Sequence, residues 1–538
     1  MATKEVLANP EYYLTETKNK FGDVIEETKV VGNQAVVYVK SSSVAKVARW
    51  AKEEMNFKQP IWLTAIDNKD NLELVYFFNH FGSPVIYTIR SFLDRDNPVV
   101  ESLTSFWPAA NWLEREMYDM FGIKFEGHPN LRRLYLPDDW EGYPLRKDYV
   151  PKEYPWKERV ESYYDSNEYY KEHFKLADNE MLIHMGPQHP ILHGTWKLMV
   201  RVRGDTIVEG WPEIGYIHRG TEKLAEGLRY EQIIPLTDRL CYVSSMSWHT
   251  LYTMTVEKLF GVEPPIRAQY IRTIVLEMQR IVSHIIWLIA LAADIGTYHS
   301  LFLYGLRERE KFLDLFEQIC GARLTYTYSR IGGVAKDIPD GWIEKLKETL
   351  ADLERHMPEY RDLMEGSELF HMRTRNVGTL SRETAIEAGA RGPMLRASNV
   401  SYDVRKIDPY LLYGDVDFDI ATAKDGDVYS RYLVRMGEVE ESIRIIQQLI
   451  DKIPSGEYRK KVSPKKPVGE AFVRTEDPRG ESAMFIVGRG TFNPYRLMIA
   501  TPAYMNLSTI PYMLKNVPFA DVAAIVASVD LCMGEIDK

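Results

Sequence analysis

Two histidines spaced four residues apart, His189 and His193, are the first candidates for chemistry in this chain. On a helix, this spacing would turn both imidazoles to one side, where they could bind zinc. Pro190 lies between them and disfavours a helix, and no acidic neighbour completes a ligand set. The pair is therefore a poor zinc site, and we expect no metal or other prosthetic group to be bound by this chain alone.

Three cysteines, Cys241, Cys320 and Cys532, lie far apart in the sequence. They are too few to ligate a four-thiolate iron–sulfur cluster, and their spacing does not indicate a disulfide framework. The Walker A, Gly-x-Gly-x-x-Gly, Gly-x-Ser-x-Gly and His-Glu-x-x-His motifs are also missing from the sequence. The chain therefore does not have the pattern of a nucleotide-binding protein, a serine hydrolase or a zinc protease.

The composition is that of a folded protein of several domains. The 538 residues are 45% hydrophobic and 27% charged, and their formal net charge of −10 disfavours nucleic acid as a partner. The N-terminus has no apolar signal segment, which indicates a cytoplasmic protein. The longest purely apolar run, Ile285–Ala293, is about half of the ~18 residues that a membrane span needs. We therefore expect any membrane contact to run through partner subunits.

Residues 1–149 have the pattern of a small α+β domain, and residues 150–180 that of a charged, tyrosine-rich linker lying extended along a surface. The expected elements of the domain are strands at 34–40, 61–66, 72–78 and 85–89, a helix over 43–56, and a second helix from Pro108 to Phe121 that Gly122 ends. An Asn68–Asn71 turn separates the second and third strands.

Residues 181–538 are predicted to form a large, mainly α-helical bundle with small β elements. Apolar side chains recur at three- and four-residue spacing over 265–293, 342–353 and 432–450. The first of these helices would be about 44 Å long at 1.5 Å per residue, enough to form the centre of the bundle.

Several longer blocks of sequence resemble one family, in the same order along the chain. Trp112–Gly122, Gly127–Arg133, Asp138–Gly142 and Arg146–Asp148 resemble the C subunit of proton-pumping NADH-quinone oxidoreductase, respiratory complex I. Blocks that resemble the D subunit of the same enzyme follow at Gly186–Gly194, Ile217–Lys223, Asp238–Ser244, Ala293–Gly296, Gly332–Val334, Pro494–Arg496 and Gly534–Asp537. The whole chain thus resembles a fused C/D subunit.

This resemblance implies both an architecture and a set of partners. The part that resembles the D subunit is homologous to the large subunit of nickel–iron hydrogenases, so its helical domain should have that fold. The implied partners are the iron–sulfur B subunit, the I subunit, the membrane H subunit and the electron-input module. The implied place is the cytoplasmic side of the bacterial inner membrane, as a peripheral subunit. The implied substrate is a quinone, reduced in a chamber shared with the B subunit while protons are pumped.

The resemblance places His193 and Tyr242 where they would hydrogen-bond the two quinone carbonyls and donate protons, with Asp294 next to His193. A carboxylate in that place would fix the imidazole tautomer and raise its pKa. Taken singly, His193 could be a structural histidine, Asp294 a helix terminator, and Tyr242 a core side chain whose hydroxyl is satisfied. The order and spacing of the three blocks favour the catalytic interpretation.

Two further positions are implied to lie near the terminal iron–sulfur cluster of the partner subunit. Arg219 matches a position where a cation would raise the cluster potential, and its alternative is an ion pair with Glu222 or another acid. Thr325 stands where the family usually has a histidine that takes up a proton when the cluster is reduced. Without that charge the cluster potential should be lower and nearly independent of pH, which favours menaquinone over ubiquinone as the substrate. The charges at 114–116 and 132–133, in the part that resembles the C subunit, are expected to form interface and structural ion pairs.

A second departure is Cys241, which replaces the second aspartate of its block. Cys241 and Cys532 fall where hydrogenases carry their two metal-binding cysteine pairs, but each pair keeps only its first cysteine. We expect two buried thiols within reach of each other and without metal. The competing functions are a membrane-bound hydrogenase or ferredoxin-linked complex, and a structural scaffold without quinone contact.

Overall fold

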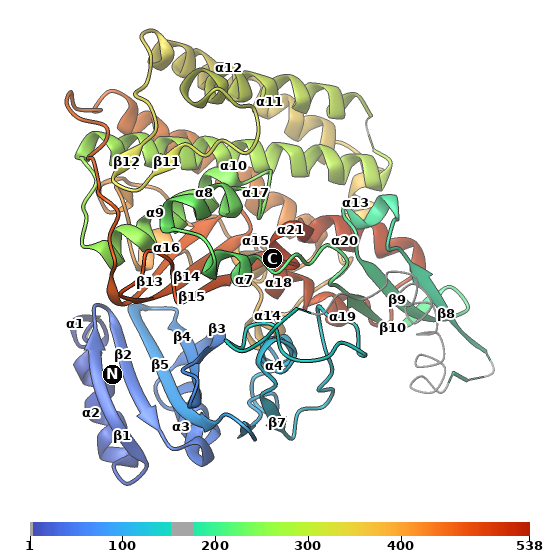
Figure 1. Cartoon of the computed structure of the whole chain (residues 1–538). Coiled ribbons are helices and arrows are strands. Elements are labelled where there is room, and N and C mark those ends of the chain that lie inside the picture. The colour runs from blue at the N-terminus through green and yellow to red at the C-terminus, as the bar shows by residue number, and fades with distance from the viewer. Residues whose placement is uncertain (1–3, 152–175, 178, 298) are drawn as a thin grey trace.

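The computed structural model describes residues 4–151, 176–177, 179–297 and 299–538. These residues form a sheet region at the N-terminal end of the chain and a later, mainly helical region (Figure 1). Most of the predicted linker, and with it the expected docking of its tyrosines, lies outside the described residues.

The N-terminal region is built on one five-stranded sheet of order β1-β2-β5-β4-β3. Its strands are β1 (Ile25–Val31), β2 (Gln34–Val39), β3 (Phe57–Asp67), β4 (Asn71–His80) and β5 (Ser83–Asp94), and its helices are α1 (Lys4–Leu7), α2 (Pro10–Phe21), α3 (Val44–Glu53) and α4 (Ala110–Phe121). The short strands β6 (Val99–Glu101) and β7 (Lys124–Glu126) pair in parallel beside it. β2 and β5 are parallel, and the other neighbours in the large sheet are antiparallel. The four strands and two helices predicted for this region are all present.

The end of α4 follows directly from its sequence. Gly122 caps the helix with a left-handed φ of 76°, a conformation that glycine adopts without steric cost. A Cβ at this position would lie 2.5 Å from the ring of Tyr143, so the close approach of the ring also requires glycine. α4 therefore stops where the pattern predicted, and the chain turns back along it.

The later region contains helices packed around one central helix. They are α7 (Thr221–Glu226), α8 (Tyr230–Asp238), α9 (Ser245–Phe260), α10 (Ile266–Ile295), α11 (His299–Cys320), α12 (Trp342–Glu365), α13 (Glu368–Thr374), α14 (Arg382–Glu387), α15 (Gly392–Arg396), α16 (Val404–Ile407), α17 (Val428–Ile450), α18 (Pro502–Leu507), α19 (Ile510–Met513), α20 (Val522–Val529) and α21 (Met533–Ile536). α10 is the longest, about 45 Å for its 30 residues, and it contacts α9, α11, α17 and α20. The three helices predicted from apolar spacing correspond to α10, α12 and α17.

Three small sheets accompany the helices. The first has order β10-β9-β8 and consists of β8 (Glu180–Met185), β9 (Lys197–Arg203) and β10 (Thr206–Glu213). The second is the antiparallel meander β13 (Val468–Asp477), β14 (Gly480–Arg489) and β15 (Arg496–Ala500), and the third pairs β11 (Ser329–Arg330) with β12 (Gly333–Val334). The meander lies between α9 and the N-terminal sheet, with β15 against β3 (Figure 1).

Buried charges join the two regions. Arg90 of β5 pairs with Glu73 of β4 at 2.9 Å and with Glu470 of β13 at 2.5 Å. Lys538 pairs with Glu116 of α4 at 2.9 Å, and all but about 2% of both side chains is buried. Glu116 thus forms the interface ion pair expected for this charged block. Each region therefore supplies charged side chains that neutralise buried charges of the other region.

α10 is long and apolar enough to cross a membrane by length and composition alone. However, 89% of its most apolar window is buried within the protein. The helix is thus the core helix of this region, as its apolar spacing predicted.

Candidate functional site

His193 lies in a loop pressed between a helix and the C-terminal end of the chain. It follows the short 3-10 turn Pro190–Leu192, which packs on α20, and it has a left-handed φ of 50°. His189 Nδ1 accepts a backbone hydrogen bond inside this turn (3.4 Å). A Cβ on Gly194 would lie 2.5 Å from Met533 Cγ, so the loop backbone lies directly against the C-terminal segment. The loop can approach this closely only because residue 194 has no side chain.

Asp294 lies in the last turn of α10, and its side chain contacts His193. His193 Nε2 and Asp294 Oδ2 are 2.6 Å apart, and the two side chains are 28% and 15% exposed. Burial lowers the pKa of His193, but the Asp294 carboxylate and the charge of Asp530 outweigh it, so the pKa is raised above its usual value. The helix continues to Ile295 and is capped by Gly296, so Asp294 does not end it; its side chain contacts His193 instead. The pair can hold a proton that remains accessible from outside.

Tyr242 occupies the segment between α8 and α9, and its side chain is 60% exposed. The alternative of a core tyrosine with a satisfied hydroxyl is therefore wrong. Desolvation by the surrounding groups raises the pKa of Tyr242, and the neighbouring Cys532, Cys241 and Asp530 raise it further. Tyr242 can thus present a protonated phenol at the surface.

The charge of Asp530 raises the pKa of both His193 and Tyr242, so Asp530 connects the two residues electrostatically. It caps α20 with a left-handed φ of 62°, and Arg479 holds it through two contacts. Arg479 Nη2 lies 2.9 Å from Asp530 Oδ1, and Arg479 Nε donates to the Asp530 carbonyl at 2.7 Å. Sequence reasoning missed both residues, because Arg479 lies in a tight hairpin and Asp530 at a helix end, places where exposed charges are common.

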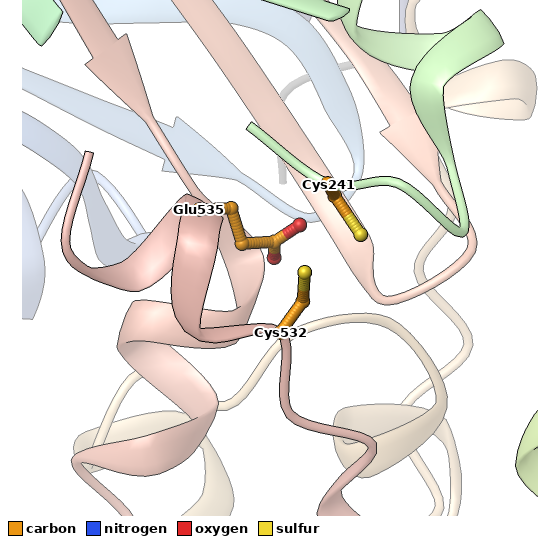
Figure 2. Close-up of side chains that lie close together, drawn as sticks. All are labelled: Cys241, Cys532 and Glu535. Carbon is orange, nitrogen blue, oxygen red and sulfur yellow. The ribbon is translucent and has the colours of Figure 1, made fainter. Parts of the chain in front are cut away.

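The same arginine connects this site to the predicted pair of thiols. Arg479 Nη1 donates to Cys241 Sγ at 3.4 Å. The thiols of Cys241 and Cys532 and a carboxylate oxygen of Glu535 all lie within 4.8 Å of one another, and all three residues are buried (Figure 2). The expectation that the two thiols are buried within reach of each other is confirmed.

The Arg219 side chain and the segment after Thr325 contact two adjacent residues, Arg239 and Asp238. Arg219 is exposed, and its Nη2 donates to the backbone carbonyl of Arg239 at 3.0 Å. Thr327, two residues after Thr325, donates to Asp238 Oδ2 at 2.8 Å, and Arg239 Nη1 contacts the same oxygen at 3.3 Å. Arg219 and the Thr325 segment therefore belong to one part of the surface, around residues 238–239.

The expected alternative for Arg219, an ion pair with Glu222, is wrong. Glu222 is buried and pairs instead with Arg496 at 2.7 Å and Lys538 at 3.1 Å. Burial alone would raise the pKa of Glu222, but these two cations outweigh it and lower the pKa below its usual value. The Arg219 guanidinium accordingly remains at the surface.

Among the described residues, one further group has the spacing of metal ligands: Glu308, Asp352 and His356. Lys311 already forms ion pairs with both Glu308 and Asp352. Arg307 also pairs with Glu308, and Arg355 with Asp352, so these cations neutralise the two carboxylates and the group is a structural cluster between α11 and α12.

Comparison with known proteins covers both regions of the fold. Residues 37–155 match the family described as "Respiratory-chain NADH dehydrogenase, 30 Kd subunit". Residues 294–465 and 460–538 match "Respiratory-chain NADH dehydrogenase, 49 Kd subunit".

Individual relatives align over most of the chain. The NADH-quinone oxidoreductase C/D subunit of Phocaeicola vulgatus is 39% identical over 491 residues, covering 88% of this chain and 94% of the relative. The C/D subunit numbered 2 of Aquifex aeolicus is 36% identical, covering 91% of this chain and 93% of the relative. The D subunit of Bacillus cytotoxicus is 44% identical over 365 residues, which are 67% of this chain and the whole of that protein. The chain therefore belongs to the family of NADH-quinone oxidoreductase C/D subunits, as a complex I subunit in which the 30 Kd and 49 Kd subunits are fused.

Proposed function

We propose that this chain forms the quinone-reduction site of its enzyme together with the iron–sulfur B subunit. The observation that carries the proposal is the 2.6 Å contact between His193 and Asp294. The exposed Tyr242 supports it, because the charge of Asp530 acts on both His193 and Tyr242. Reduction of a quinone to a quinol consumes two electrons and two protons. An imidazolium and a phenol are two groups that can hydrogen-bond the carbonyls and then release those protons.

In this mechanism the chain positions the headgroup and supplies its protons. The Asp294 carboxylate stabilises the charged form of His193, which then donates to one quinone carbonyl. Tyr242 donates its phenolic hydrogen to the other carbonyl. The iron–sulfur cluster of the partner subunit supplies the electrons. Arg219 and Thr325 lie on the surface that faces this cluster in the proposal.

The wider assignments rest on family membership. We propose the B, I and H subunits and the electron-input module as partners, and a peripheral position on the cytoplasmic side of the inner membrane. The proposal also includes proton pumping, menaquinone as the substrate, no prosthetic group on this chain, and a helical region with the architecture of hydrogenase large subunits. Only Cys241 and Cys532 lie together, and Cys320 is in α11, so the four thiolates of a nickel–iron centre are missing.

A photoreactive short-chain quinone tests the site directly in the purified complex. We expect it to label peptides that contain residues 186–194 and 238–244, and we expect excess unlabelled quinone to prevent this labelling. Labelling of other subunits alone, in an assembled and active complex, would instead favour the structural scaffold.

A further inference from the structure

The buried thiol pair has a geometry suited to covalent chemistry. Cys241 comes from the segment between α8 and α9, whereas Cys532 caps α21, which carries Glu535. Figure 2 shows both sulfur atoms and the Glu535 carboxylate pointing into one gap, and the ligand atoms lie within 4.8 Å of one another. Cys241 is 0% and Cys532 5% exposed. The two thiols, 291 residues apart in the sequence, are thus held as neighbours away from bulk solvent.

The charges around the pair favour thiol chemistry over metal binding. Arg479 Nη1 already donates to Cys241 Sγ at 3.4 Å, and a guanidinium stays charged at any pH of interest. A divalent cation bound to this sulfur would have that positive charge as a close neighbour. Burial raises the pKa of the Cys241 thiol well above its usual value, and the Arg479 guanidinium partly offsets this rise, which favours the thiolate, the form that reacts.

Glu535 completes the set as a proton acceptor. Its Oε1 accepts a hydrogen bond from Ala503 N at 3.0 Å, while its buried Oε2 has no partner among the described residues. Burial, together with the nearby Cys241 and Asp477, raises the pKa of Glu535 well above its usual value. A raised pKa makes the ionised Glu535 carboxylate a stronger base, and within reach of both sulfurs this form can take a proton from either thiol.

We propose that Cys241 and Cys532 are a redox-active dithiol, and that the quinone in the neighbouring site is its oxidant. This inference rests on the proposed function, since Tyr242 follows Cys241 directly in the chain. In the reaction two S–H bonds break and one S–S bond forms. Two electrons and two protons pass to the quinone, which leaves as quinol. Glu535 takes the first thiol proton and releases it during the same turnover, and a small-molecule dithiol reverses the oxidation.

Formation of the bond would change the quinone site through the backbone. The sulfur atoms must close from their present separation to about 2.05 Å, which displaces Cys241. Tyr242 would move with it, and Arg479 would lose the thiol that accepts its hydrogen bond. The oxidised form should therefore bind quinone more weakly, with a KM several-fold higher than that of the reduced form.

The experiment uses the whole purified complex, reduced with dithiothreitol, freed of it anaerobically and kept without NADH. One equivalent of a short-chain quinone is added, free thiols are alkylated, and the digested peptides are analysed by mass spectrometry. We expect a linked peptide pair containing Cys241 and Cys532, two hydrogen masses lighter than the free thiols, and about one quinol formed per complex. Cys532→Val should abolish both signals.

Cys320→Ser is the matched control, since Cys320 Sγ donates to the carbonyl oxygens of Phe316 and Ala322, in and just after α11. This variant should give the same linked peptide and quinol yield as the natural protein. Full alkylation of Cys241 and Cys532 after quinone treatment would overturn the proposal, and this measurement needs no variant to fold.

Diamide, a thiol oxidant that needs no binding site, distinguishes this failure from failure of the quinone site. A linked peptide with diamide but not with quinone overturns quinone as the oxidant. No linked peptide with either reagent overturns the dithiol itself. Photolabelling at residues 186–194 reports on the quinone site independently of both results.

Discussion

His193 Nε2 lies 2.6 Å from Asp294 Oδ2, although the two residues are 101 positions apart. The contact joins a loop between two strands to the last turn of the central helix. Its chemical effect has a definite sign, because the Asp294 carboxylate opposes the burial that would otherwise lower the pKa of His193. The protonated imidazole therefore persists to higher pH than it would alone, and is lost as the pH rises through this raised pKa.

The first prediction is that Asp294→Asn shifts the pH dependence of quinone reduction. The amide keeps the shape of the side chain but removes the negative charge, so the pKa of His193 falls. The alkaline limb of the pH–rate profile should then move to lower pH, and steady-state assays from mildly acidic to mildly alkaline pH would measure it. Asp340→Asn, at an exposed position, should leave the profile unchanged. An unaltered profile in Asp294→Asn would show that Asp294 does not control the protonation of His193 during quinone reduction.

The second prediction concerns Tyr242→Phe, which removes one hydroxyl from a side chain that is 60% exposed. Assembly should be normal, because no described residue hydrogen-bonds this hydroxyl. Quinone reduction should drop at least tenfold, about 1.4 kcal/mol of lost transition-state stabilisation. Transfer to an artificial acceptor upstream of the site should persist. The matched control is Tyr512→Phe, at another half-exposed tyrosine. Normal quinone turnover in assembled Tyr242→Phe would refute the proton-donor role.

The third prediction concerns Thr325, whose hydroxyl cannot gain a positive charge when the partner's cluster is reduced. The potential of that cluster should therefore be nearly independent of pH in the natural protein. In Thr325→His it should rise at low pH and fall as pH increases. Redox titration followed by electron paramagnetic resonance at several pH values would measure both. A natural cluster whose potential already falls steeply with pH would remove the argument for menaquinone.

The fourth prediction is that Lys538→Met destabilises the folded chain. Lys538 pairs with Glu116 at 2.9 Å and Glu222 at 3.1 Å, and all three side chains are almost fully buried. Loss of the cation leaves Glu116 without its ion-pair partner and Glu222 paired with Arg496 alone, and should cost about 3–5 kcal/mol of unfolding free energy. Arg444→Met, which breaks exposed pairs, should cost at most about 1 kcal/mol.

The unfolding free energy lost in Lys538→Met should also depend on pH. Burial raises the pKa of Glu116 to about 7 even though Lys538 lowers it, so the variant should raise it further. Protonation relieves the uncompensated charge, so the destabilisation should shrink as the pH falls from above the variant's raised pKa to about 7, and level off below that value, where Glu116 is protonated in both proteins. Urea unfolding at an acidic and at an alkaline pH would show whether the variant loses less unfolding free energy at the acidic pH.

The sequence predicted those elements whose apolar residues follow one regular spacing. α12 exposes one face and buries another, α10 and α17 carry the same apolar spacing but are buried over most of their surface, and the N-terminal strands are bounded by clear turns. β14 was not anticipated, because it is buried along nearly its whole length and shows neither alternation nor helical spacing.

Buried charges were the other failure of prediction. Arg396 lies in the core and contacts Glu438 and Glu476, each at 2.8 Å. An arginine considered by itself is predicted to be exposed, because buried arginines are rare unless they are paired. The partners that allow Arg396 to be buried lie on a distant helix and strand, so the sequence around Arg396 does not reveal them. For the same reason, Arg479 and Asp530 could not be identified as site residues from the sequence. His193, Tyr242 and Asp294 were found only through the resemblance of their blocks, since each has a plain structural alternative.

The ion pairs between the two regions also bear on how the enzyme is assembled. A subunit of the length of the D-subunit relative, which aligns with 67% of this chain, would carry Glu470 and Lys538 without the N-terminal region that supplies Arg90 and Glu116. Its partners must then find it by diffusion, at whatever concentration the cell provides. In a single chain the same pairing is intramolecular, with an effective concentration in the millimolar range for short connections. Fusion therefore guarantees one copy of each region per enzyme and shields these charges during synthesis, before the other subunits arrive.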